Sequence, residues 1–192
     1  MKKLTLAVLL ALSTSVFADT GNSIGISYAL RDTIAGDNDR PNRQGFNVTY
    51  AHRFNQSWAV DTNQQFRTER FNTEGGNSST RVEGGVTYTQ KLTDTLAFYT
   101  RGGLGYRFTT TDDNTYYSVE PGLRFQTTDA LNLRFAWRYR DSFNDRINDQ
   151  THTVRLGAEY ALTKEDTLSV GVDRFYGDSQ LMGYNLGYTH RF

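Results

Sequence analysis

Apolar and polar residues alternate along ten segments of this chain, each about as long as a β-strand. In the last segment, YNLGYTHRF, Tyr184, Leu186, Tyr188, His190 and Phe192 occupy every second position. Alternation with period two gives a strand one apolar and one polar face. The ten segments are 24–30, 45–54, 58–66, 81–92, 96–108, 117–125, 131–140, 153–162, 168–176 and 184–192. The pattern predicts an all-β protein.

The composition favours a membrane barrel over a soluble sandwich, which also has alternating strands. The chain has 12 Tyr, 12 Phe, 17 Gly and only 2 Pro, with a mean hydropathy of −0.62. A transmembrane barrel has an apolar lipid face and a polar lumen, so no window is apolar on average. Aromatic residues recur at two levels of the apolar face, with Phe54 and Trp58 near turns and Phe108 and Phe143 near loops. Two aromatic girdles are typical of a membrane interface, so we expect a closed antiparallel transmembrane β-barrel.

The connections between the segments alternate in length. The short ones are 55–57, 93–94, 127–130 and 163–167, and the longer ones are roughly 31–43, 71–79, 109–116, 141–151 and 177–180. Bacterial outer-membrane barrels have an even strand number, short periplasmic turns and longer outer loops. The pattern therefore predicts ten strands with both termini in the periplasm.

The two ends of the chain carry export and assembly signals. Residues 1–18 have a charged start, an apolar run and a small-residue cleavage site, which predicts a signal peptide followed by a barrel of residues 19–192. Because the sequence has no cysteine, we expect neither a lipid anchor nor a disulfide framework. Tyr188, His190 and Phe192 resemble the terminal signal that the barrel assembly machinery reads. In a closed barrel this last strand must pair with the first, around 24–30.

Strand alternation also assigns the charged residues of the lumen. The basic ones are Arg53, Arg67, Arg81, Lys91, Arg101, Arg107, Arg124, Arg134, Arg138, Arg140, Arg155 and Arg191. The acidic ones are Asp61, Glu69, Glu83, Glu120, Glu159 and Asp173. Arginine keeps its charge at physiological pH and pairs carboxylates with two hydrogen bonds. The excess of arginine predicts a channel for passive diffusion of small anionic solutes.

The middle of the lumen allows two interpretations. Arg101, Arg138 and Arg155 lie about midway along their strands, so we expect them at the narrowest and least screened level. Alternatively, Glu120 pairs with Arg101 and Arg138 and fills the interior, which would make a plugged structural or adhesive barrel. Eight-stranded barrels are filled and sixteen-stranded ones hold aqueous channels, so ten strands decide neither way.

Three stretches, TDALNLRFAWRYRDSF, YYSVEPGLRF and STRVEGGVTYTQKLTDTL, resemble the oligogalacturonate-porin family, which includes sialic-acid channels. The likeness covers residues 45–178. It implies a monomeric porin for acidic oligosaccharides, with arginine tracks that match Arg124, Arg134, Arg138, Arg140 and Arg155. That family has twelve strands and a longer chain, so twelve strands remain the alternative to the ten counted here.

We expect no enzyme, cofactor or metal site. His152 is flanked by threonine and its alternation turns it toward lipid, so the nucleophile, base and orienting group of an outer-membrane protease or lipid A deacylase do not assemble. The expected partners are outer-membrane lipid, lipopolysaccharide, the assembly machinery and a small anionic solute, with no nucleic acid. The predicted path is lined by Arg67, Arg81, Arg101, Arg107, Arg124, Arg134, Arg138, Arg140, Arg155, Glu83, Glu120 and Asp173.

Overall fold

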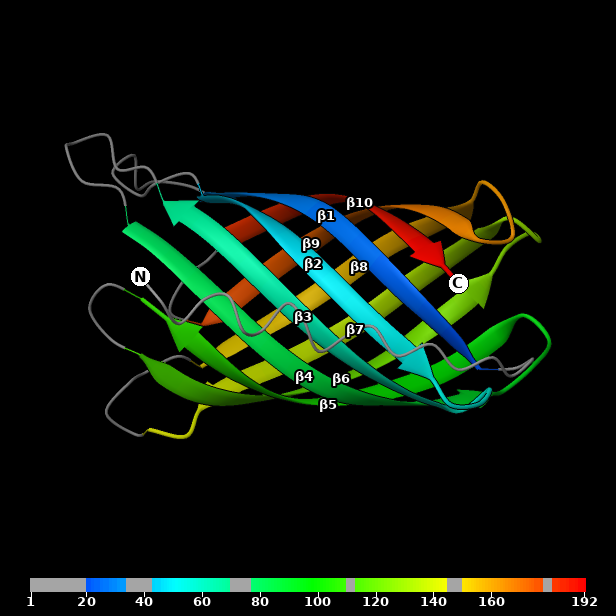
Figure 1. The fold of residues 1–192 in the computed structure, drawn as a ribbon, viewed down its shortest axis with the longest axis horizontal. Coiled ribbons are helices and arrows are strands. Elements are labelled where there is room, and N and C mark those ends of the chain that lie inside the picture. The colour runs from blue at the N-terminus through cyan, green and yellow to red at the C-terminus, as the bar shows by residue number, and fades with distance from the viewer. Residues whose placement is uncertain (1–19, 34–42, 70–76, 110–112, 145–149, 178–180) are drawn as a thin grey trace.

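The computed structural model describes residues 20–33, 43–69, 77–109, 113–144, 150–177 and 181–192. Within them the chain forms ten strands joined into one closed antiparallel barrel (Figure 1). The strands are β1 (Gly21–Thr33), β2 (Arg43–Arg53), β3 (Trp58–Glu69), β4 (Asn77–Lys91), β5 (Leu96–Phe108), β6 (Asn114–Gln126), β7 (Leu131–Ser142), β8 (Thr151–Ala161), β9 (Asp166–Gly177) and β10 (Leu181–Arg191). The predicted fold class is confirmed, with ten strands rather than the alternative twelve. The predicted signal peptide lies outside the described residues.

In the described part of the chain, no helix has the length and apolar character needed to cross a membrane.

The barrel closes because its first strand pairs with its last strand, as predicted. β1 pairs with β10 from Ser23–Arg191 to Thr33–Leu181, and on its other edge β1 pairs with β2. Beyond the strand, Phe192 exchanges two backbone hydrogen bonds with Asn22, at 2.9 and 3.0 Å. The backbone ladder therefore extends to the last residue. Its partner, Asn22, lies two residues before the segment 24–30 that was expected to pair with the last strand.

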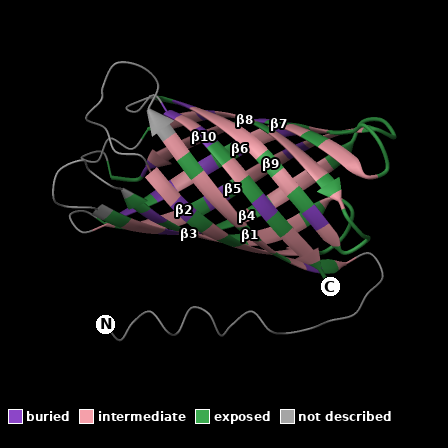
Figure 2. Ribbon diagram, turned by 90° about the horizontal axis from the view of Figure 1, so that it is seen from above, coloured by how far each residue is buried: buried purple, intermediate pink, exposed green. Residues whose placement is uncertain are grey.

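Apolar side chains cover the outside of the barrel, and polar ones fill its inside. Among the described residues, twenty-nine large hydrophobic side chains are exposed, with Leu104 at 65% and Leu186 at 59%. Buried side chains are mostly polar or charged, including Glu83 and Glu120 at 5% and 4% exposed. More and less exposed residues alternate along the strands in Figure 2. This inverted distribution suits a wall with lipid outside and a polar lumen inside.

The strands continue further than the hydrophobic alternation predicts at the end with the longer connections. β1 extends to Thr33, β4 begins at Asn77 and β6 begins at Asn114. A backbone ladder needs only N–H and C=O groups, so it continues where outward residues become polar. One consequence is that Arg31, expected in a loop, lies on β1 and lines the lumen.

All four short connections are four-residue turns of the same kind, at 54–57, 92–95, 127–130 and 162–165. In each turn the first N–H donates to the carbonyl of the residue after the turn, and all four bonds are 2.9 Å long. The second residue accepts backbone N–H bonds through its side-chain oxygen, and these residues are Asn55, Thr93, Thr128 and Thr163. The turns lie at the same end of the barrel as the start of β1 and the end of β10 (Figure 1).

Replacing the accepting side chain should weaken a turn. In Thr128→Ala, the N–H groups of Ala130 and Leu131 lose an acceptor at 3.3 and 3.0 Å. We expect a loss of about 1 kcal/mol in the free energy of unfolding, the usual value of such bonds. Urea unfolding in detergent micelles measures it. Thr128→Ser keeps the hydroxyl and serves as the control, and equal stability of both variants would contradict this account of the turn.

Candidate functional site

A cavity of about 850 Å³ occupies the lumen, and all ten described strands contribute to its lining. It reaches from Arg53 and Arg191, near the turns, to Arg31 and Arg140, near the opposite end. The positive lining residues are Arg31, Arg53, Arg67, Arg81, Arg101, Arg124, Arg134, Arg138, Arg140, Arg155 and Arg191. The negative ones are Asp61, Glu83, Glu120, Glu159 and Asp173. Eleven arginines thus face five carboxylates.

The residues predicted to line a solute path converge on this cavity, except for one. Those that line it are Arg67, Arg81, Arg101, Arg124, Arg134, Arg138, Arg140, Arg155, Glu83, Glu120 and Asp173. Arg107 lies opposite Arg81 in the register of β4 and β5 but is not part of the lining. The side chain of Glu69 lies outside the described part. The role of these residues in transport stays a prediction.

Opposite charges meet at the middle of the lumen in what we call the charged belt. The belt consists of Arg101, Arg138, Arg155, Asp61, Glu83, Glu120 and Asp173. Arg101 on β5 donates from Nε and Nη2 to Asp61 on β3, at 2.9 and 2.5 Å, and from Nη1 to Glu83 on β4. One guanidinium therefore joins the carboxylates of two strands.

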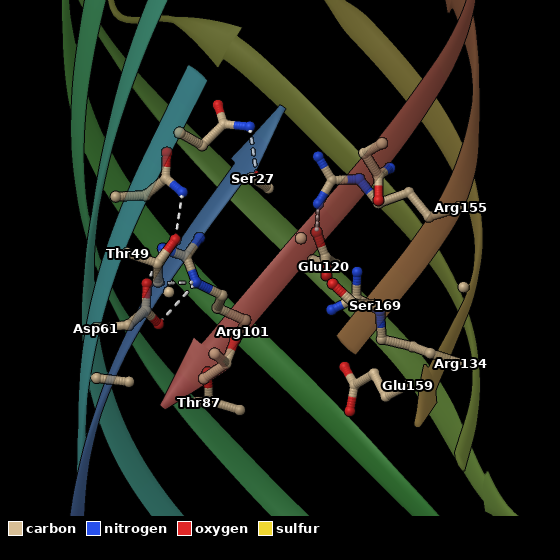
Figure 3. A pocket seen from close by; sticks show the side chains of 18 of the residues that line it. Ser27, Thr49, Asp61, Thr87, Arg101, Glu120, Arg134, Arg155, Glu159 and Ser169 are labelled. Atoms are coloured by element: carbon tan, nitrogen blue, oxygen red, sulfur yellow. Dashed lines mark hydrogen bonds and ion pairs between the residues drawn. The ribbon is translucent and has the colours of Figure 1, made fainter. Parts of the chain in front are cut away.

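Other pairs of the belt reach further around the barrel. Glu83 on β4 also accepts a bond from Arg138 on β7, so this pair passes over β5 and β6. Arg155 on β8 donates to Glu120 on β6 at 2.8 Å, and its Nε lies 3.9 Å from Asp173. Figure 3 shows Arg101 directed toward Asp61 and Arg155 toward Glu120. Arg101, Arg138 and Arg155 were expected at the least screened level of the lumen. In the structure all three form ion pairs with carboxylates.

Two glycines make room for the belt. A Cβ on Gly85 would stand 2.5 Å from Cζ of Arg101, and one on Gly103 would stand 2.8 Å from Oε1 of Glu83. Both glycines face inward beside long charged side chains, and only a missing side chain lets those groups lie against the wall. The sequences VEGGV and RGGLG therefore have a role in the lumen that their hydrophobic pattern did not reveal.

Two groups of arginines flank the belt. The loop-end cluster consists of Arg31, Arg67, Arg81 and Arg140, and the turn-end cluster of Arg53, Arg124, Arg134 and Arg191. The charges that act most strongly on buried Arg67 are the guanidinium groups of Arg31, Arg81, Arg140 and Arg43. At the other end, Arg53 is repelled by Arg124 and Arg191. The positive excess of the lumen therefore lies on both sides of the belt.

Three aromatic rings also face the lumen, although the alternation pattern did not single them out. Arg124 lies over Tyr99, Arg140 over Tyr116 and Arg31 over Phe175, with Cζ 5.1, 5.4 and 4.0 Å from the ring centroids. Such cation–π contacts hold an arginine in place without neutralising it. The missed signal is the aromatic doublet, because one ring of each pair at 98–99, 116–117 and 175–176 must point inward.

Small uncharged residues form the opposite wall, on β10, β1 and β2. We call it the small-residue wall, and its members are Gly25, Ser27, Ala29, Asn47, Thr49, Ala51, Gly183, Asn185, Gly187 and Thr189. β6, which carries Glu120, lies five strands from β1 in either direction around the barrel. Because the seven belt residues project from β3 to β9, the space left open at the level of the belt adjoins the small-residue wall.

Histidines lie on the outer face, away from this charged lumen. The ring of His152 is centred 5.6 Å from Trp137, and those of His52 and His190 are 4.8 and 6.2 Å from Phe54 and Phe192. Among the described residues, no group of three or more His, Asp or Glu is placed to hold a metal ion. The lumen offers charge and hydrogen bonding, with arginine as its main functional group.

Comparison with known proteins agrees with this architecture. A family model for the outer membrane protein beta-barrel domain matches residues 4–161. The chain belongs to this outer-membrane barrel family. No sequence among curated proteins matches it.

Solved barrels are similar to this family member in fold. An outer membrane channel from Pseudomonas putida F1 has 12% identity and a TM-score of 0.56, covering 90% of this chain and 96% of that one. The β domain of the Bordetella autotransporter BrkA also has 12% identity and a TM-score of 0.56, covering 90% and 99%. The structural neighbours include the KdgM porin in complex with disordered oligogalacturonate, at 11% identity, a TM-score of 0.47 and coverage of 90% and 99%.

Adding one methyl group beneath the belt should disturb it. In Gly85→Ala the new Cβ displaces Arg101 from its two carboxylates, and we expect a loss of about 1–3 kcal/mol in the free energy of unfolding. The adjacent Gly84→Ala is the control, because its Cβ would have no neighbour nearer than 3.9 Å. Urea unfolding in micelles compares the two barrels. A Gly85→Ala barrel as stable as the control would show that Arg101 is not fixed by the belt.

Proposed function

We propose that this barrel is an outer-membrane channel for passive diffusion of small anionic solutes, in particular acidic oligosaccharides. The observation that carries the proposal is the lumen cavity, whose described lining has eleven arginines and five carboxylates. A confined lumen of low dielectric strengthens each fixed charge relative to bulk water. Anions that shed part of their hydration there gain hydrogen bonds from guanidinium groups in exchange.

The arrangement of the charges supports passage rather than tight binding. The loop-end and turn-end clusters attract an anion into either mouth, while the belt between them has three guanidinium groups and four carboxylates. Conduction requires sites weak enough to release the solute. A solute that follows the small-residue wall passes the belt without replacing its ion pairs. Two attractive mouths joined by a weaker middle suit a channel that releases what it admits.

The chemistry of arginine points to carboxylate-bearing sugars within the class of anions. Planar guanidinium groups bind carboxylates with two parallel hydrogen bonds. Hydroxyl and amide groups of Ser27, Asn47 and Thr49 on the small-residue wall can bond sugar hydroxyls. The resemblance to the acidic-sugar porins, at Arg124 and Arg134 among others, supports the same class.

The proposed setting is the outer membrane of a Gram-negative cell. Residues 1–18 would direct export and be removed, leaving a monomeric barrel of 19–192. The short turns and both chain termini would face the periplasm. Lipid and lipopolysaccharide would surround the apolar surface. The barrel assembly machinery would recognise Tyr188, His190 and Phe192.

A plugged structural or adhesive barrel is the second candidate, and the belt itself favours it. Glu83 joins Arg101 and Arg138 across the interior, so ion pairs occupy part of the cross-section. Catalysis has less support, because the histidines of the described chain pack against outward aromatic rings.

Reversal potentials under a salt gradient in planar bilayers test the channel. We expect anion preference, reduced in Arg31→Ser/Arg67→Ser because two positive charges leave one mouth. The control Lys91→Ser/Lys164→Ser removes two charges near the turns, outside the lumen lining, and should keep the preference. A trigalacturonate should reduce the wild-type current more than a neutral trisaccharide. A wild-type barrel that conducts nothing, or prefers cations, would refute the channel and favour the plugged barrel.

Glu83→Gln separates the two candidates by a second route. The variant removes the negative charge shared by Arg101 and Arg138, so a channel should show stronger anion preference with a modest change in conductance. A plugged barrel should change from closed to conducting when its central pair is lost. Single-channel recording distinguishes these results, and unchanged selectivity in an open barrel would show that the belt does not face the ion path.

A further inference from the structure

The two strands that flank β1 end in nearly the same sequence. Residues 45–54 read GFNVTYAHRF and residues 183–192 read GYNLGYTHRF, with six of ten positions identical. Two further positions keep their character, with Phe46 matching Tyr184 and Val48 matching Leu186. The second copy contains the residues of the proposed terminal signal, and the first repeats them as Tyr50, His52 and Phe54.

The copies also have the same local geometry. On β2, Tyr50 donates to Oδ1 of Asn22 at 2.8 Å, and Nδ1 of His52 lies 2.8 Å from the same oxygen. Asn22 is the residue of β1 directly opposite His52. The tyrosine and histidine of this copy thus bond one acceptor on the preceding strand of the barrel.

The C-terminal copy repeats this arrangement in the neighbouring hairpin, β9–β10. Tyr188 donates to Oδ1 of Asp166 at 2.6 Å, and Nδ1 of His190 lies 2.9 Å from that oxygen. Asp166 is the residue of β9 directly opposite His190. In both hairpins, β1–β2 and β9–β10, the second strand is fastened to the first in the same way.

Before the neighbouring strands pair with it, each of these hairpins has the same edge unpaired, which is the far edge of its second strand. In the finished barrel the far edge of β2 pairs with β3, and the far edge of β10 pairs with β1 (Figure 1). In an isolated hairpin those edges have unpaired N–H and C=O groups and would accept a strand of another protein. Phe54 and Phe192, at 50% and 55% exposed, stand at the end of that edge.

Other strands that run toward the turns lack the repeat. The corresponding outward residues are Tyr88, Gln90 and Leu92 in β4 and the turn after it, Leu123, Phe125 and Thr127 in β6 and its turn, and Ala158, Tyr160 and Leu162 in β8 and its turn. These strands form the same four-residue turns without the tyrosine–histidine pair. Neither turn formation nor the outer face therefore requires the repeated sequence.

We propose that residues 45–54 are a second, internal assembly signal, which binds the same unpaired strand edge of the barrel assembly machinery as residues 183–192. This rests on the terminal signal proposed above. The first hairpin presents its copy through the edge that β3 later takes, and the last hairpin through the edge that β1 takes. Strand addition supplies the backbone bonds, and the outward rings provide specificity.

The test compares Phe54→Ala with Leu162→Ala, because both residues occupy the first position of a turn and are 50% and 52% exposed. Each full-length mature variant is assembled into proteoliposomes that contain the purified assembly machinery, and separately folded into detergent micelles without it. We expect Phe54→Ala and Phe192→Ala to slow the assisted reaction roughly three- to tenfold, as for loss of an aromatic contact. Leu162→Ala should keep the wild-type rate, Phe54→Tyr should restore it, and all variants should fold equally fast in micelles.

Two results would overturn the internal signal. One is equal assisted assembly of Phe54→Ala and Leu162→Ala, and the other is an equal delay of Phe54→Ala in micelles, which would assign Phe54 to packing alone. Normal assisted assembly of Phe192→Ala would remove the terminal signal and the internal one with it. The channel is tested apart from both, because micelle-folded Phe54→Ala should conduct as the wild type does.

Discussion

The closed backbone ladder is the constraint on which the rest of this molecule depends. In lipid every N–H and C=O group needs a partner within the protein, and a sheet meets this need only when its first and last strands join. Pairing of β1 with β10, extended by Phe192, completes the ring. Closure fixes which side of each strand faces inward, so the charged residues of ten strands share one confined lumen.

Strand alternation was sufficient to predict most of this architecture. Each predicted segment overlaps an observed strand, because the lipid face must stay apolar along its whole length. The prediction ended too early at Leu30, where outward residues become polar while the ladder continues to Thr33. Arg31 was lost from the predicted lumen for that reason alone. The inward rings of the aromatic doublets, Tyr99 and Tyr116 among them, were not assigned to the lumen, because the lumen prediction considered charged residues only.

Contacts across the lumen could not be derived from the sequence. Arg101 and Glu83 lie on neighbouring strands, but Arg138 reaches Glu83 past two strands, and this depends on the tilt and shear of the closed barrel. Alternation predicts only that these side chains point into the lumen, and it does not predict which of them are in contact. Their relative heights decide whether a guanidinium group lies near a carboxylate or near another arginine, which is why the arginines of the belt pair with carboxylates while Arg67 and Arg53 lie near other arginines.

The small-residue wall has a mechanical consequence. Among the described side chains, arginine–carboxylate pairs span the arc from β3 round to β9, and none of these pairs includes a residue of β10, β1 or β2. The barrel thus has one side braced by the ion pairs of the belt and another side lined by small residues at that level, and the closing junction lies within the second. Separating the strands there breaks backbone bonds but none of the ion pairs of the charged belt. The junction that closes the ring is therefore also one that can open while the charged belt stays intact.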